Sequence, residues 1–166
     1  MIAKKIYKLL FLVFINLLIL VSCETKKQTE NPVINTSLVI SNLSDEDFNS
    51  IGTSHITKDE FKKVTFILDM KHNNKISKRT INIPIFKDVV NTYDNTERYW
   101  FGDDIKIDNI SENYAYYKTT FILYTGNLSK DKITDIFHSK NILVSYQKNK
   151  KTIKEIIKLE TILKYK

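Results

Sequence analysis

Cysteine and histidine, which often serve as the nucleophile and the general base, are few and widely separated in this sequence. It contains one cysteine, Cys23, and three histidines, His55, His72 and His138. Nucleophilic catalysis needs a base placed beside the nucleophile. His72 lies in an expected turn and His138 at the end of an expected helix, which leaves only His55, beside Gly52, in a small and flexible stretch. We therefore expect no catalytic residue and predict that the protein is not an enzyme.

Metal and phosphate sites are also poorly supported by the residue spacing. Asp103, Asp104 and Asp108 follow Gly102 closely, and carboxylates on a loop could bind Ca²⁺. However, the spacing and the closing glutamate of an EF-hand are absent, and no His/Cys cluster is present. The three glycines are isolated, whereas phosphate-binding loops need several close together. We expect a solvated acidic turn at 103–108, and neither a metal nor a cofactor.

An aromatic cluster between residues 93 and 124 is the least ordinary feature of the sequence. Its members are Tyr93, Tyr99, Trp100, Phe101, Tyr114, Tyr116, Tyr117 and Tyr124. Such side chains can fill the core of a β-sandwich, and exposed ones can stack on sugars or anchor a protein partner. Core filling is the default interpretation, and the sequence leaves both open. If a binding surface exists, Trp100 and Tyr99 are the candidate partner-binding residues.

The first 23 residues have the three parts of a secretory signal. Lys4, Lys5 and Lys8 are basic, residues 9–21 are almost wholly apolar, and the small Ser22 comes next. The 13 apolar residues would form a helix of about 20 Å, which is shorter than the hydrocarbon core of about 30 Å. The alternative, an uncleaved transmembrane helix, therefore fits less well than a cleaved signal peptide.

Leu20, Val21, Ser22 and Cys23 together resemble the lipobox of bacterial lipoproteins. The resemblance implies cleavage between Ser22 and Cys23, which removes residues 1–22. It also implies a diacylglycerol on the Cys23 thiol, with fatty acids such as palmitate at the new N-terminus. Two or more acyl chains anchor a protein stably. The expected location is the extracytoplasmic face of the cell membrane.

Size and charge limit the remaining possibilities. Of 166 residues, 144 would remain after cleavage, which suits one domain. The net charge of +7 includes three signal lysines, so the mature chain would carry +4. Arg79 and Arg98 are the only arginines, and nucleic-acid binders favour arginine for bidentate contacts. We expect no nucleic acid partner, and an envelope protein or a cell-wall component instead.

Hydrophobic periodicity predicts a mainly β domain over residues 36–166, after a lipidated N-terminus and flexible linker at 23–35. Alternating apolar residues predict strands near 38–40, 64–71, 76–85, 105–107, 114–125, 142–146 and 152–163. We expect 64–71 and 76–85 to form a hairpin, and 87–97 to be a loop. The segment 152–163 also fits a helix, but its β-branched residues favour a strand.

Helical signals are scarce in the same domain. Ser129 can cap a helix over 129–139, with an apolar stripe of Ile133, Ile136 and Phe137. Residues 44–47 predict a single helical turn. About seven strands with one short helix indicate an antiparallel β-sandwich with an immunoglobulin-like layout.

Three functions remain open at this point. The first is a non-catalytic lipoprotein of the cell envelope that binds a partner. The second is an exclusion or immunity lipoprotein of a mobile element, which blocks a phage, plasmid or toxin at the surface. The third is a carbohydrate-acting hydrolase with a site around Trp100, Asp103 and Asp104.

Overall fold

The computed structural model describes residues 31–52, 57–126 and 128–166. The predicted signal peptide, the lipobox with Ser22 and Cys23, and His55 lie outside the described residues. Within the described part, the strands are β1 (Val33–Asn42), β2 (Phe61–Lys71), β3 (Ile76–Asn82), β4 (Tyr99–Ile107), β5 (Tyr114–Tyr124), β6 (Asn141–Lys148), β7 (Lys151–Lys158) and β8 (Leu163–Tyr165). The helices there are α2 (Asp45–Asn49), the 3₁₀ helix η1 (Lys58–Glu60), α3 (Phe86–Asn91), α4 (Lys130–Ile136) and α5 (Leu159–Ile162).

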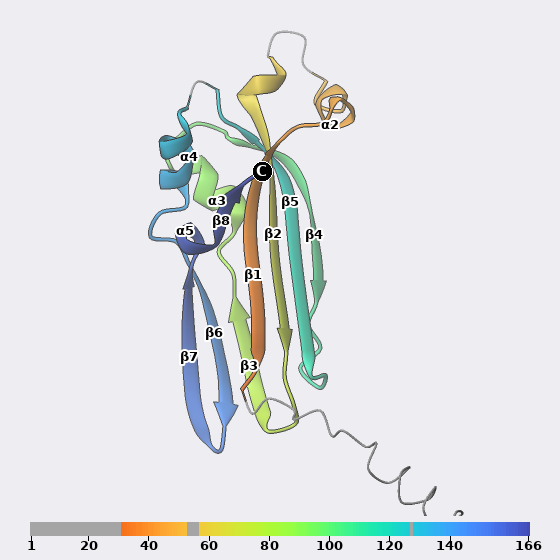
Figure 1. Cartoon of the computed structure of the whole chain (residues 1–166), viewed down its shortest axis with the longest axis vertical. Coiled ribbons are helices and arrows are strands. Elements are labelled where there is room, and N and C mark those ends of the chain that lie inside the picture. The colour runs from red at the N-terminus through yellow and green to blue at the C-terminus, as the bar shows by residue number, and fades with distance from the viewer. Residues whose placement is uncertain (1–30, 53–56, 127) are drawn as a thin grey trace, which may run out of the picture.

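The strands form two sheets (Figure 1). One has five strands in the order β4-β5-β2-β1-β8, and the other has three in the order β3-β6-β7. If β1 to β7 are lettered A to G, these sheets are the ABED and CFG sheets of an immunoglobulin constant-type sandwich. The expected immunoglobulin-like layout is therefore confirmed. One pair departs from the expected antiparallel arrangement, because β8 joins the free side of β1 in parallel.

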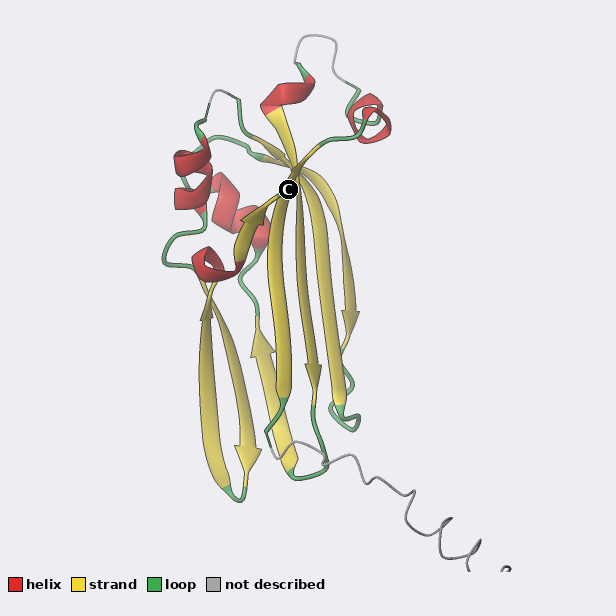
Figure 2. Cartoon of the chain, viewed as in Figure 1, coloured by secondary structure: helices red, strands yellow, loops and turns green. Residues whose placement is uncertain are grey.

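The core lies between the two sheets and extends under the helices. Along β2, Val64, Phe66, Leu68 and Met70 are fully buried and alternate with half-exposed neighbours. They meet buried residues of β6 and of the helices in one cluster. Figure 2 shows α3, α4 and α5 gathered beyond one end of β6 and β7, on the side of the smaller sheet. The three-stranded sheet and the helices thus together cover one face of the five-stranded sheet.

The helices outnumber the single one expected. The predicted helix is confirmed as α4, with the Ser129 side chain accepting a hydrogen bond from Lys132 N and with Ile133 and Ile136 buried. The turn after Ser44 is confirmed as α2. The expected loop at 87–97 is wrong in its first part, where α3 buries Phe86, Val89 and Val90. These three apolar residues are spaced so that a helix places them on one face, which packs against the core.

The predicted hairpin of residues 64–71 and 76–85 is wrong. β2 pairs with β1 and β5, whereas β3 pairs with β6 in the other sheet. In this layout the chain crosses between the sheets at residues 72–75, so the turn joins two layers instead of two neighbours. A short polar turn between two alternating strands looks the same in sequence in both cases.

The two ends of the domain differ slightly from expectation. β1 already begins at Val33, opposite Lys71, so three residues assigned to the linker belong to the sheet. The preference for a strand at the C-terminus is confirmed for β7, which follows a tight turn with positive φ at Asn149 and Lys150. Beyond Lys158 the chain instead forms α5 and then β8, and Leu159 is fully buried.

Gly102 allows close packing of β4 on β5. A Cβ at this position would lie 2.5 Å from the Thr120 carbonyl oxygen and 2.6 Å from the Phe121 Cβ. Gly102→Ala therefore forces a backbone shift, and we expect the free energy of unfolding to fall by about 1–3 kcal/mol. Chemical denaturation measures this, with Asp103→Ala on the exposed edge as control. Equal stability of the two variants would contradict the packing described.

Candidate functional site

The most concentrated polar chemistry surrounds Arg79, a side chain that sequence reasoning did not single out. Arg79 is 5% exposed. It follows Lys78, which has a φ of 49°, in the irregular stretch where the β3–β6 register shifts between Ser77 and Thr80. Such bulges re-aim a side chain. Here the guanidinium reaches residues 29 to 33 positions further along the chain.

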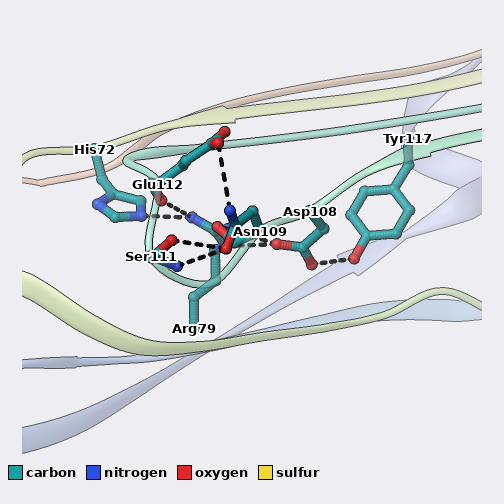
Figure 3. Close-up of polar contacts among 7 residues, drawn as sticks. All are labelled: His72, Arg79, Asp108, Asn109, Ser111, Glu112 and Tyr117. Carbon is teal, nitrogen blue, oxygen red and sulfur yellow. Dashed lines mark hydrogen bonds and ion pairs between the residues drawn. The ribbon is translucent and has the colours of Figure 1, made fainter.

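All five N–H donors of the Arg79 guanidinium have partners (Figure 3). Nε and Nη2 donate to Asp108 Oδ1 at 3.2 and 2.5 Å. Nη2 also donates to the Asn109 carbonyl at 3.1 Å, and Nη1 to the Glu112 carbonyl at 3.0 Å. The remaining Nη1 proton points at His72 Nε2, 2.6 Å away. Five donors is the full capacity of arginine, so none is left for a ligand.

His72 contributes to this cluster as an acceptor. A guanidinium can only donate, so His72 Nε2 must carry a lone pair. Its hydrogen then lies on Nδ1, which donates to the Asn73 carbonyl at 2.9 Å. The two contacts thus hold the imidazole ring in one orientation. This geometry makes His72 a structural link between the β2–β3 and β4–β5 connections.

The electrostatics of Asp108 fit a structural ion pair. Burial raises the pKa of Asp108, but the hydrogen bonds from Tyr117 and Arg79 outweigh it, and the net pKa lies below the ordinary value. Burial, together with the hydrogen bond to Asp108, raises the pKa of the Tyr117 hydroxyl strongly. The carboxylate stays ionised and the phenol neutral. We assign this cluster (Arg79, Asp108, His72 and Tyr117) the role of tying the sheets together, and call it the Arg79 network.

The three aspartates proposed as an acidic turn do not converge. Asp103 and Asp104 belong to β4, opposite Thr120 and Thr119, so consecutive side chains point to opposite faces of the sheet. Asp108 is engaged by Arg79. Among the described residues, no group of three or more His, Cys, Asp or Glu side chains could hold a metal ion. The prediction of an acidic turn at 103–108 is wrong because charged residues also occur on exposed edge strands.

The aromatic cluster divides between core and surface. Tyr99 stacks on Phe121, with ring centroids 4.9 Å apart and an interplanar angle of 19°. Trp100 lies edge-on to Phe61 at 5.6 Å, on the opposite face of the sheet, and is 39% exposed. Phe101 is 42% exposed. Of the two candidate partner-binding residues, Trp100 is thus available at the surface, while Tyr99 serves mainly the core.

A groove of about 360 Å³ opens between β4 and the segment that runs from β3 into α3. Ile81, Ile83 and Phe86 line one side, and Tyr99 and Tyr117 line the other. Asp104 and Lys106 of β4 also line the groove. The groove is largely apolar with a few charges, which is the usual character of a binding site.

β4 borders this groove as an edge strand. Among the strands of the described residues it pairs only with β5, and it ends the five-stranded sheet. Ile105 and Ile107 are 48% and 47% exposed, which adds to the exposed Trp100 and Phe101. These apolar side chains alternate with the charged Asp103, Asp104 and Lys106, and an exposed edge strand of this kind is a ready site for pairing or docking. The candidate site is therefore the β4 surface, defined as Trp100, Phe101 and residues 103–107.

Comparison with protein-family models, curated proteins and solved structures finds no match to this chain. Within the residues that the structure describes, no helix is long and apolar enough to cross a membrane.

The depressed pKa of Asp108 predicts a pH-dependent stability. A carboxylate with a lowered folded pKa stabilises the protein above its unfolded pKa, about 3.9, and loses this effect as the pH falls through the folded value. Asp108→Asn should lower the free energy of unfolding by about 3 kcal/mol at pH 7, because it leaves a buried cation unpaired. The difference from wild type should shrink below about pH 4.

Denaturation at several pH values measures this difference. Asp103→Asn makes the same chemical change at an exposed site of β4 and should cost less than about 0.5 kcal/mol. A loss at Asp108→Asn that is small, or constant from pH 7 to pH 3, would refute the role of its carboxylate.

Proposed function

We propose that the protein is a lipid-anchored lipoprotein of the cell envelope whose immunoglobulin-like domain is a non-catalytic binding module. Residues 1–22 would direct export, and Cys23 would carry the lipid on the extracytoplasmic face of the membrane. The support for the anchor is the run of basic residues, the apolar segment and the Leu20-Val21-Ser22-Cys23 sequence. The partner would be an envelope protein or a cell-wall component.

The exposed aromatic end of the β4 surface is the observation that carries the binding role. Trp100 and Phe101 are consecutive in sequence, and they are 39% and 42% exposed. Tryptophan is enriched among residues that dominate binding energy, because it buries much area and keeps a hydrogen-bond donor. The ring of Trp100 rests against the buried Phe61, so it is presented in a defined orientation.

The internal polar groups support a binding role over a hydrolytic one. The Arg79 network is saturated by its own partners. Asp103 and Asp104, which a hydrolase site near Trp100 would require to converge, lie on opposite faces of β4. Glycoside hydrolysis needs two carboxyl groups facing one bond. The geometry therefore favours recognition by surface shape.

Substitution Cys23→Ala tests the anchor. We expect the variant to be released from the membrane or to remain as an unprocessed precursor, because no thiol is left for lipid attachment. Membrane fractionation and incorporation of a labelled palmitate report the two events. The control Thr25→Ala should stay lipidated and membrane-bound. A Cys23→Ala protein that is processed and retained as in wild type would refute the anchor.

Substitution Trp100→Ala tests the binding surface. The tagged protein is used to capture partners from envelope extracts, separated into protein and cell-wall polymer fractions. We expect at least about a tenfold loss of the specifically captured component, as for loss of a dominant contact. Tyr93→Ala, which removes another aromatic side chain of similar exposure away from β4, should bind as wild type. Equal capture by both folded variants would contradict the assignment.

A further inference from the structure

The free edge of β4 leaves a row of backbone N–H and C=O groups without strand partners. β4 is nine residues long, and within the residues 31–52, 57–126 and 128–166 it pairs on one side only. Long exposed edges of this kind are templates for pairing with another chain. The side chains that such a strand would meet decide which chain can pair there.

The side-chain pattern of β4 is self-complementary about Ile105. Asp104 and Lys106 flank it and both line the groove, so they lie on one face of the strand. Ile105 points to the other face, as does Ile107. Neither Asp104 nor Lys106 forms an ion pair in the part of the chain that the structure describes. One charge of each sign therefore flanks a central apolar residue, with Lys106 Nζ 5.6 Å from the centre of the Tyr117 ring.

We propose that β4 pairs antiparallel with β4 of a second copy of this chain, about a two-fold axis at Ile105. In this register Ile105 lies opposite Ile105 of the other copy. Asp104 of each copy then lies opposite Lys106 of the other, so the dimer gains two cross-strand charge pairs. A two-fold interface requires that each contact occur twice in this way. The two five-stranded sheets become one continuous sheet.

Neighbouring registers lack this complementarity. When the two-fold axis is perpendicular to the sheet, two residues that lie directly opposite each other always come from the same face of β4. An axis at Asp104 sets two aspartates against each other, and an axis at Lys106 sets two lysines against each other. Like charges directly opposite one another are destabilising. An axis at Asp103 again opposes two carboxylates. Charge alone thus selects Ile105 among the central positions of β4.

The proposal goes beyond the binding role and does not depend on it. The paired stretch covers residues 103–107, while Trp100 lies within the irregular stretch between Tyr99 and Gly102 where the β4–β5 register shifts. The aromatic end of the surface thus remains outside the paired stretch. A dimer would display two such ends from one sheet, and multivalent display strengthens binding to a repeating envelope component.

A charge-swap experiment tests the register in the full-length protein. Two differently tagged copies are co-expressed and co-purified after solubilisation of the membranes. Asp104→Lys paired with itself, or Lys106→Asp paired with itself, opposes like charges twice. Each should reduce co-purification about tenfold, given up to about 1 kcal/mol per cross-strand pair. Asp104→Lys paired with Lys106→Asp restores both attractions and should recover the wild-type yield.

The control for this experiment is Asp103→Lys, which makes the same charge change at a position that faces Ile107 in the proposed register. It should co-purify with itself nearly as wild type does. If Asp103→Lys is as damaging as Asp104→Lys, or if the mixed pair recovers nothing, the register is refuted. Monomeric wild type would refute the dimer itself.

Cysteine cross-linking in membranes provides a second readout. Directly opposed residues of an antiparallel pair have Cα atoms about 4.5–5.5 Å apart, within the range that a disulfide spans. Ile105→Cys should therefore form a covalent dimer on mild oxidation. Ile107 is equally exposed, but its two copies would lie about 14 Å apart, so Ile107→Cys should not.

The unsubstituted chain reports any cross-linking through Cys23, its only cysteine. Absence of the Ile105→Cys dimer, or equal dimer from Ile107→Cys, would overturn the proposal. Partner capture that depends on Trp100 would survive that result, so failure of the dimer and failure of the binding role are distinguishable.

Discussion

The buried guanidinium of Arg79 is the constraint on which the arrangement of the two sheets depends. It extends from β3 of the smaller sheet to the connection between β4 and β5 of the larger one, and to His72 between β2 and β3. A buried charge is costly unless it is paired and fully hydrogen-bonded. Its five hydrogen bonds therefore hold three segments in one relative position. Moving any of these segments would leave buried N–H groups of the guanidinium without an acceptor.

Arg98, just before β4, is a second buried arginine that is paired with a carboxylate and hydrogen-bonded to backbone carbonyls. It is 5% exposed, pairs with Asp94 and donates to the Tyr124 carbonyl at 3.0 Å. The Asn91 side chain at the end of α3 accepts from the backbone N–H groups of Arg98 and Tyr99. Both arginines of the sequence are thus used inside the fold, where a planar donor array suits several carbonyls. The position of β4, and hence of the surface proposed to bind, follows from these internal bonds.

Much of the fold could be predicted because alternation along a half-buried strand is a local property. The apolar residues of β2, β5 and β6 and the Ser129 cap of α4 carry their structural meaning within a few positions. The partners of a strand are not local. The pairing of β3 with β6, the helix at Phe86 and the placement of Asp103 within β4 depend on what the rest of the core leaves uncovered.

The site was predictable only in part, for the same reason. Trp100 could be proposed from residue type, because tryptophan is enriched among residues that dominate binding energy. Tyr99 looks equivalent in sequence but is drawn into the core by Phe121 across the strand pair. No sequence signal marks Arg79, because its partners, Asp108 and two backbone carbonyls, lie about thirty positions further along the chain. They belong to the β4–β5 connection, whose course only the tertiary fold defines.

A double-mutant cycle between Arg79 and Asp108 tests most directly whether this pair ties the sheets together. The free energies of unfolding of Arg79→Met, Asp108→Leu and the double variant are compared with wild type at pH 7. Each single change should be strongly destabilising, because it leaves one buried charge unpaired. The double variant should be no worse than either single one, so that the coupling reaches about 2–3 kcal/mol. Additive losses would contradict the account.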